Sequence, residues 1–290
     1  MIPKETYVPS KKKNDYTIKP VQVPLKKPDD IDKRDRKNVL AVTDYVEDMY
    51  ALFRQQESKV CPSFMDRQPV NNPKKMRGIL IDWIIGIHHK NFRLCPETLY
   101  LTVHMLDRFL AGNQVPLNKL QLVGVTALLI ASKYEDIYPP AVQDLSYITG
   151  NAVNPEEILD METTILKDLD YRISKPTAHT FLVRYTRAGH ANVELAQSAS
   201  YILEGTLLQA DLVSAYLPSE LAAASVYIAR RSITGREPWT STLVKYTGYT
   251  EDQVIPIAKK CISIENKFHE VDHKYRRSCY GKVAVKSYGF

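Results

Sequence analysis

The chain has 290 residues, of which 44% are hydrophobic and 25% are charged, as is usual for a globular protein of one large domain or two average ones. It contains no apolar stretch of the ~18 residues that span a bilayer and no apolar signal-peptide core, so we expect localisation to the nucleus and cytoplasm and no membrane partner. Its four cysteines (Cys61, Cys95, Cys261 and Cys279) form no Cys-x-x-Cys pair, which argues against a zinc ribbon, a redox motif and a disulfide framework.

Residues 1–38 are predicted to form a disordered basic tail. They contain five prolines and carry eleven basic against six acidic residues, which is +5 of the chain's net charge of +6. The remaining residues carry 28 basic and 27 acidic side chains, a net charge of +1. A DNA-binding body usually has a clustered basic face, so this near-neutral body predicts no nucleic-acid partner. Lys11-Lys12-Lys13 is either a nuclear import signal or, more commonly, a solvated charge run.

Residues 39–57 are predicted to form an amphipathic helix, and later helices are marked by where they begin. The apolar face of this first helix comprises Val42, Tyr45, Val46, Met49, Tyr50 and Phe53. Asn72-Pro73 and Asn154-Pro155 each combine a capping residue with proline at the first helical position. Pro96 and Pro116 begin two more helices. Strand-like alternation is weak throughout, so the predicted fold class is all-α.

The run Met76-Arg-Gly-Ile-Leu-Ile-Asp-Trp83 opens a helix that is apolar on nearly all sides. Two charged residues, Arg77 and Asp82, lie inside this apolar segment. Because an unpaired buried charge is costly, we expect each of them to have a fixed partner. Such a helix is either the central helix of its bundle or leaves one strip exposed as a groove for a partner.

The second half of the chain repeats the first. At an offset of 98 residues the matching pairs are Ile130-Ala131 with Ile228-Ala229, Leu145 with Leu243, and Thr149-Gly150 with Thr247-Gly248. Pro116 and Pro218 each precede an Ala-rich apolar helix. The repeat predicts a tandem of two all-α units of about 100 residues, each with roughly five helices. We expect the first unit, with its preceding helix, to span residues 39–172 and the second unit, with a C-terminal extension, residues 173–290.

The two units differ at one pair of charges. Lys133 follows the central helix of the first unit, and Glu162 lies in its last helix. The corresponding residues of the second unit are Arg231 and Ala258. A pair that the fold requires should occur in both copies, so its presence in one copy suggests a role in binding. Two ordinary solvated charges are an equally simple interpretation.

The sequence offers no recognisable catalytic constellation. It has no phosphate-binding loop, no Gly-x-Ser-x-Gly, and no Cys/His signature of a thiol enzyme. His88 and His89 are adjacent, so on a helix they point about 100° apart and cannot share a metal ion as residues four apart do. We therefore expect a non-catalytic protein, without metal or cofactor, that recognises its partners by surface.

These runs resemble those of the cyclins, specifically the mitotic A/B type. The run from Met76 to Trp83 is similar to the family's Met-Arg-Ala-Ile-Leu-x-Asp-Trp signature, and Leu106-Asp-Arg-Phe-Leu110 follows at the expected spacing. The run Ala131-Ser-Lys-Tyr-Glu-Asp-Ile-Tyr-Pro-Pro140 resembles a second family motif. The resemblance covers about residue 39 to the end and leans to the B type. It implies a tandem of two five-helix cyclin-box repeats with an N-terminal helix and a C-terminal extension.

The resemblance implies a regulatory subunit that binds and activates a cyclin-dependent Ser/Thr kinase during mitosis. In the family, the lysine and glutamate that match Lys133 and Glu162 hold backbone groups near the mobile helix of the kinase. The kinase-binding positions that the resemblance implies are Tyr45, Met49, Lys133, Tyr134, Glu135, Asp136, Glu162, Leu166 and Ile173.

The exposed strip then resembles the family's docking groove for Arg-x-Leu motifs of substrates or inhibitors. The positions that match its lining are Met76, Ile79, Leu80, Trp83, Leu120 and Gln121. The family usually has glutamate three residues after the tryptophan to receive the motif's arginine, whereas this chain has Gly86. We therefore expect a groove that binds apolar residues but discriminates poorly for arginine. Arg77 and Asp107 match a structural ion pair of the family and are not assigned to binding.

Residues 1–38 contain neither the Arg-x-x-Leu signal that mitotic cyclins usually carry nor a Lys-Glu-Asn signal. Turnover then uses another signal, or the chain is a trimmed or divergent form. Three rival classes stay open. A general transcription factor core shares the two-repeat fold but predicts a basic body and often a zinc ribbon. A helical scaffold without a kinase partner would not explain why Lys133 and Glu162 occur in one unit only. An enzyme of unknown class is the least favoured of the three.

Overall fold

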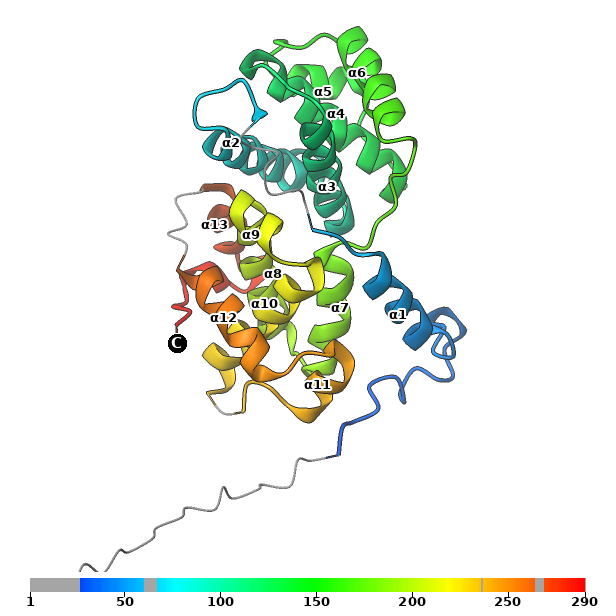
Figure 1. The fold of residues 1–290 in the computed structure, drawn as a ribbon, viewed down its shortest axis with the longest axis vertical. Helices are drawn as coiled ribbons and strands as arrows, with labels where there is room; N and C mark the ends of the chain where they lie inside the picture. The colour runs from blue at the N-terminus through cyan, green and yellow to red at the C-terminus, as the bar shows by residue number, and fades with distance from the viewer. Residues whose placement is uncertain (1–26, 60–66, 236, 264–268, 290) are drawn as a thin grey trace, which may run out of the picture.

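The computed structural model describes residues 27–59, 67–235, 237–263 and 269–289. All regular elements within these ranges are helices, which confirms the all-α prediction. The helices form two groups, one above the other in Figure 1, which correspond to the two predicted repeats. No helix in these ranges is long and apolar enough to cross a membrane.

Each repeat consists of five principal helices. Those of the first repeat are α2 (Pro73–Gly86), α3 (Pro96–Gly112), α4 (Leu117–Glu135), α5 (Val142–Ile148) and α6 (Pro155–Asp168), and η3 (Ile87–Phe92) extends α2 as a short π-helix. Those of the second repeat are α7 (Ala178–Ala188), α8 (Val193–Leu207), α10 (Pro218–Thr234), α11 (Ser241–Thr247) and α12 (Glu251–Ile262). A short extra helix, α9 (Ala210–Ala215), lies between α8 and α10.

The predicted helix starts are found where the capping residues indicate. The side chain of Asn72 accepts a hydrogen bond from the backbone N–H of Lys75 at 3.3 Å, and Pro73 occupies the first helical position of α2. At the start of α6, the Asn154 side chain accepts a hydrogen bond from the backbone N–H of Glu157 at 2.8 Å. The Glu157 carboxylate in turn accepts one from the backbone N–H of Asn154. These reciprocal bonds satisfy backbone donors that the first turn of a helix leaves unpaired.

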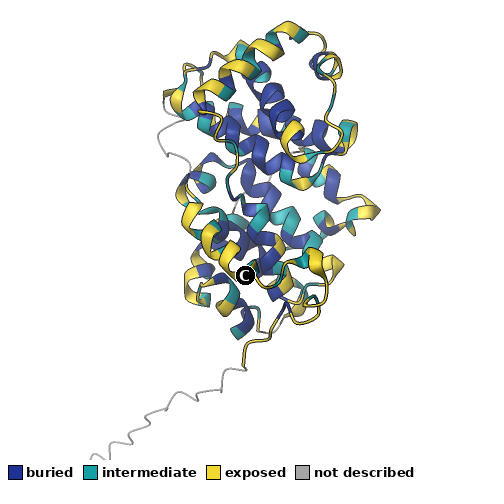
Figure 2. Cartoon of the chain, turned by 90° about the vertical axis from the view of Figure 1, so that its right-hand side faces the viewer, coloured by how far each residue is buried: buried dark blue, intermediate teal, exposed yellow. Residues whose placement is uncertain are grey.

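The central helices α4 and α10 lie inside their repeats. Residues 122–132 of α4 are all buried, and Ala222, Ala223 and Ala224 of α10 are fully buried. Figure 2 shows this buried interior surrounded by exposed outer helices. A β-carbon added at Gly124 would lie 2.8 Å from Leu80 Cδ1, so α2 and α4 approach more closely than any larger residue would allow. Small side chains thus place both central helices in the core, as their composition predicts.

Both charges of the apolar helix α2 have the fixed partners that the sequence predicts. The Arg77 guanidinium donates to both carboxylate oxygens of Asp107 at 2.6 Å, and both side chains are 1% exposed. Arg77 also donates to the carbonyl oxygen of Leu207 in α8 at 2.8 Å, so it joins the two repeats. The Asp82 carboxylate accepts from the backbone N–H groups of His269 and Glu270, at the start of α13 (His269–Tyr275). Burial raises the pKa of Asp82, against the effect of these two bonds.

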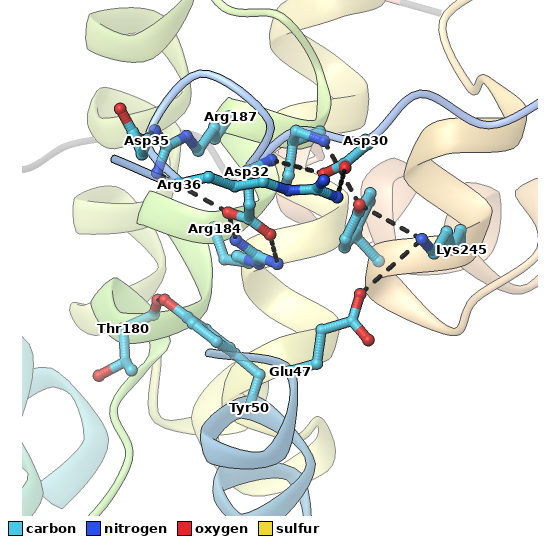
Figure 3. A network of polar contacts seen from close by, with 12 residues as sticks. Asp30, Asp32, Asp35, Arg36, Glu47, Tyr50, Thr180, Arg184, Arg187 and Lys245 are labelled. Atoms are coloured by element: carbon cyan, nitrogen blue, oxygen red, sulfur yellow. Dashed lines mark hydrogen bonds and ion pairs between the residues drawn. The ribbon is translucent and has the colours of Figure 1, made fainter. Parts of the chain in front are cut away.

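The predicted disorder of residues 1–38 is wrong for the part that the structure describes. Residues 1–26 lie outside the described ranges, but Ile31 and Asp32 are buried against the second repeat. Arg184 of α7 donates to the two carboxylate oxygens of Asp32 at 2.5 and 2.6 Å (Figure 3). The prediction considered the composition of the segment and not the buried arginine that the segment neutralises.

We call residues 29–38 the N-terminal strap. Its backbone N–H groups at Asp29 and Ile31 donate to Thr242 and to the hydroxyl of Tyr246, which both lie on α11.

The helix that follows the strap is shorter than the predicted range 39–57. A single turn, η1 (Val39–Ala41), ends at Val42, whose φ of 48° is left-handed, and α1 (Val46–Gln56) begins only after this break.

The C-terminal extension packs against both repeats. Helix α13 lies beside α2 and α8, as its position in Figure 1 indicates. Lys274 Nζ lies 2.6 Å from Glu204 Oε1 on α8, and the hydroxyl of Tyr275 donates to the same oxygen at 2.7 Å. The short turns η4 (Ser278–Tyr280) and η5 (Val283–Val285) follow, with Val283 fully buried. The extension is therefore part of the folded body.

Candidate functional site

An exposed ion pair joins the C-terminal end of α4 to the middle of α6 in the first repeat. Lys133, at the C-terminal end of α4, donates to the two carboxylate oxygens of Glu162 on α6 at 2.7 and 2.9 Å. The side chain of Lys133 is 45% exposed and that of Glu162 is 15% exposed. Because a solvent-exposed ion pair contributes only about 0–1 kcal/mol to stability, this pair adds little to the fold and stays accessible to a partner.

The corresponding place in the second repeat has a different structure. Arg231 donates to the hydroxyl of Tyr227 at 3.4 Å, within its own helix α10. Ala258, the counterpart of Glu162, is fully buried in α12. The contact between α10 and α12 thus forms without the ion pair, which supports the inference that the fold does not require it.

The residues after Lys133 divide into an exposed and a structural group. Tyr134 is 53% exposed, and Glu135 is also exposed. Burial, with the negative charges of Glu97 and Asp136, raises the pKa of Glu135. Asp136 instead caps α3, because its carboxylate accepts from the backbone N–H of Cys95 at 2.9 Å and from the Thr98 hydroxyl at 2.5 Å. Both oxygens of Asp136 are thus engaged within the chain, and this side chain fixes the end of α4.

Helix α1 presents a second exposed surface. Tyr45 is 64% exposed and Met49 is 42% exposed, while Tyr50 and Phe53 pack against the core. The hydroxyl of Tyr50 donates to the carbonyl oxygen of Thr180 on α7 at 3.0 Å. In Figure 1, α1 and α6 lie along the same side of the molecule, on either side of the connection between the two repeats.

Leu166 and Ile173 are less accessible than Tyr45, Met49 and Tyr134. Both are half-buried and pack against the hydrophobic core, Leu166 from α6 and Ile173 from the connection that follows it. The structure therefore brings Lys133, Tyr134 and Glu162 together at one exposed corner. Tyr45, the N-cap of α1, and Met49 within α1 lie on a separate element.

The predicted docking groove is narrower than its six predicted positions suggest. Ile79 is 48% exposed on α2, and Met76, Trp83 and Gln121 are half-buried. Leu80 and Leu120 are only 7% and 8% exposed, because they pack in the core between α2 and α4. The accessible apolar strip therefore consists of Met76, Ile79 and Trp83, and the two leucines support it from below.

A surface cavity of about 550 Å³ opens beside Trp83. Its lining includes Gly86, Glu270 of α13, and Tyr147 and Ile148 of α5. Sequence reasoning missed the last three residues. Tyr147 is 75% exposed, but an aromatic residue on a short apolar helix gives no signal that separates surface from core.

Glu270 fills the space in front of Gly86. A β-carbon at position 86 would lie 3.2 Å from Cδ and Oε2 of Glu270, so the carboxylate lies where a longer side chain at this position would begin. Lys90 Nζ donates to Glu270 Oε1 at 2.8 Å. Burial opposes ionisation of Glu270, but Lys90 outweighs it and lowers the pKa of the carboxyl. The end of the groove thus has a carboxylate, that of Glu270, although Gly86 stands where the family usually has glutamate. Lys90 of the same chain already pairs with this carboxylate.

Comparison with known sequences identifies the two repeats. Residues 48–174 match the family described as "Cyclin, N-terminal domain", and residues 176–287 match "Cyclin, C-terminal domain". The chain belongs to the cyclin family. This result confirms the resemblance that the motifs at Met76 and Ala131 carry.

Its relatives include B-type cyclins of plants and animals. Cyclin-B1-3 of Arabidopsis thaliana is 44% identical over 264 residues, a match that covers 89% of this chain and 63% of the relative. Human G2/mitotic-specific cyclin-B2 is 41% identical over 270 residues, which cover 90% of this chain and 67% of the relative. The predicted leaning to the B type is thus confirmed. The chain spans less than two thirds of the length of the first plant relatives it matches.

The fold also matches a solved cyclin structure. The viral cyclin of herpesvirus saimiri superposes with a TM-score of 0.64 at 22% sequence identity, over 76% of this chain and 97% of the viral chain. At this low identity the match concerns the fold alone, and it agrees with the tandem of two helical repeats.

Proposed function

We propose that this cyclin is a non-catalytic regulatory subunit that binds a cyclin-dependent Ser/Thr kinase and stabilises its active conformation. The observation that carries the proposal is the exposed Lys133–Glu162 pair, whose glutamate is replaced by the buried Ala258 at the matching position of the second repeat. The mitotic relatives support a role in mitosis. We also propose that the protein acts in the nucleus and cytoplasm.

The mechanism is a shift of population between kinase conformations. An active kinase requires a helix glutamate to pair with the ATP-site lysine and the activation loop to leave the substrate site. A partner that binds this arrangement more tightly than the inactive one makes it dominant, by the difference between the two affinities. Lys133 offers N–H donors and Glu162 offers oxygen acceptors, so together they can hold backbone carbonyl and N–H groups next to the kinase helix.

The test is phosphorylation of a Ser/Thr-Pro peptide by a purified cyclin-dependent kinase from the same organism, with and without this chain. We expect stimulation by orders of magnitude and co-elution of the two proteins. If several such kinases show neither stimulation nor co-elution, the proposal is wrong, and DNA binding by the isolated body becomes the next test.

We further propose that Met76, Ile79 and Trp83, with the cavity beside Trp83, dock short apolar motifs of substrates or inhibitors. These residue types are frequent in adaptable protein-binding grooves. The strip lies on α2, and the proposed kinase contact lies on the C-terminal end of α4 and the middle of α6, so the two surfaces use different helices.

Arg-x-Leu and Ala-x-Leu peptides are expected to bind this groove with comparable affinity. The only carboxylate among the residues that line the described cavity, Glu270, is already paired with Lys90. Lys90→Ala should free it, and because a charge-assisted hydrogen bond is worth about 1.5–3 kcal/mol, tempered by exposure, the variant should prefer arginine several-fold. Fluorescence anisotropy of labelled peptides measures both affinities. A tenfold preference for arginine in the unmodified chain would contradict the prediction.

A further inference from the structure

Three side chains from distant parts of the sequence converge where α13 meets η3. They are His89 of η3 and Glu270 and His273 of α13. One potential ligand atom from each residue lies within 4.8 Å of those of the other two. His89 Nε2 is 3.6 Å from Glu270 Oε2, and the rings of His89 and His273 are stacked with their centroids 6.4 Å apart. The arrangement places two imidazoles and one carboxylate around a common point.

The buried member of this cluster lacks ordinary hydrogen-bond partners. The side chain of His89 is 2% exposed, yet neither of its ring nitrogens has a hydrogen-bond partner among the described residues. Glu270 Oε2, 3.6 Å from His89 Nε2, instead forms an ion pair with Lys90 Nζ at 2.6 Å. Because a buried polar atom without a partner costs about 1–3 kcal/mol, such atoms usually face a partner of another kind, such as a water molecule or an ion. Here the unpartnered ring of His89 faces the carboxylate of Glu270 and the ring of His273.

We propose that His89, Glu270 and His273 bind a divalent transition-metal ion, with Zn²⁺ as the representative ion. Two imidazoles and one carboxylate form a ligand set that binds zinc and leaves one tetrahedral position open for water. Calcium and magnesium prefer ligand sets made of oxygen atoms, so the two histidines favour a transition metal.

Lys90 competes for the same carboxylate. Its Nζ lies 2.6 Å from Glu270 Oε2 as an ion pair, although its hydrogen bond goes to Oε1. The lysine side chain is 39% exposed, so it can turn into solvent when a metal ion takes its place. Removing this ammonium group should therefore strengthen metal binding, which is a result that a merely destabilised variant would not give.

The run His269-Glu-Val-Asp-His273 has the His-Glu-x-x-His spacing of helical zinc sites. The structure uses it differently. The ring of His269 stacks on His273 with centroids 6.2 Å apart, but its nitrogens are not among the converging atoms. Glu270, which in that motif is a general base, is here one of the converging side chains. The proposed site therefore connects the C-terminal extension to the first repeat. The sequence analysis missed this site because His89 is remote in sequence from residues 269–273.

The experiment uses the untagged full chain, stripped with EDTA and titrated with ZnCl₂ by calorimetry. Titration with CoCl₂ is followed by visible absorption. We expect one ion per chain and a higher melting temperature in its presence, since a ligand that binds only the folded state stabilises it. His273→Ala and Glu270→Gln change exposed or half-buried side chains and should each weaken binding at least tenfold. Lys90→Ala should bind more tightly. His190→Ala, which removes an exposed histidine elsewhere, should bind like the unmodified chain.

Three results would overturn the proposal. The first is no binding of one ion per chain. The second is unchanged affinity in both His273→Ala and Glu270→Gln, which would mean an adventitious ion held elsewhere, for example at exposed Cys279. The third is loss of binding in His269→Ala while Glu270→Gln binds normally, which would contradict the assigned ligands. Since the titration needs no kinase, its failure would leave the proposed kinase regulation intact.

Discussion

Alanine at both Lys133 and Glu162 is expected to abolish kinase activation and to leave the melting temperature nearly unchanged. Each side chain would lose a charge-assisted hydrogen bond to the kinase, worth about 1.5–3 kcal/mol. Together these losses correspond to a fall in affinity of about 10²- to 10⁴-fold. The fold loses only an exposed ion pair, which contributes about 0–1 kcal/mol. Peptide phosphorylation and calorimetric binding to the kinase measure the first effect, and thermal unfolding measures the second.

Two further variants separate partner binding from the internal ion pair. Exchanging the two residues, as Lys133→Glu with Glu162→Lys, restores the ion pair but inverts the charges that face the kinase. We expect this variant to fold like the unmodified chain and to activate no better than the double alanine variant. Arg231→Ala, at the matching position of the second repeat, should activate normally. Normal activation by the charge-exchanged variant would show that the pair acts only within the chain.

Arg77→Ala is expected to lower the free energy of unfolding by about 3–5 kcal/mol, because it leaves the buried carboxylate of Asp107 without its partner. The Leu207 carbonyl also loses a donor, and with it the repeats lose one of the bonds that join them. Since proteins are typically stable by only about 5–15 kcal/mol, this single change should bring the chain close to unfolding. The midpoint of urea unfolding measures the loss.

The matched control removes both charges. Arg77→Met combined with Asp107→Leu leaves no unpaired charge in the core, and replacing a buried ion pair by apolar residues is often nearly neutral. We expect this double variant to recover most of the stability that Arg77→Ala loses, apart from the bond to Leu207. A double variant no more stable than Arg77→Ala would place the loss in packing and not in the unpaired charge.

The sequence predicted those features of the fold that depend on local interactions. Asn72 and Asn154 mark helix starts because capping involves only the next few residues. That Arg77 and Asp82 have partners was predictable from the cost of burying a charge. The partner of Asp82 was not, because it is the backbone of a helix near the other end of the chain. The same holds for the strap, where composition indicated disorder but Asp32 binds the distant Arg184.

The candidate site was predictable to a similar degree. Lys133 and Glu162 could be singled out by comparing aligned positions of the two repeats. This comparison uses the sequence alone and needs no distances between atoms. The exposure of the α2 strip was predicted less well. Whether Leu80 and Leu120 face solvent depends on how closely α4 approaches, and that distance is set by Gly124. That a carboxylate lies beside Gly86 was not predictable, because Glu270 reaches this point from α13.

The N-terminal strap has a consequence for the affinity of the proposed kinase contact. Helix α1 has eleven residues, a length at which an isolated helix in water is marginal. Strap contacts such as Asp32–Arg184 hold the chain before it, and Tyr50 holds the helix itself on α7. The face with Tyr45 and Met49 is therefore preorganised before any encounter. Binding then costs less conformational entropy than ordering a free segment would, and a larger share of each contact with the kinase contributes to affinity.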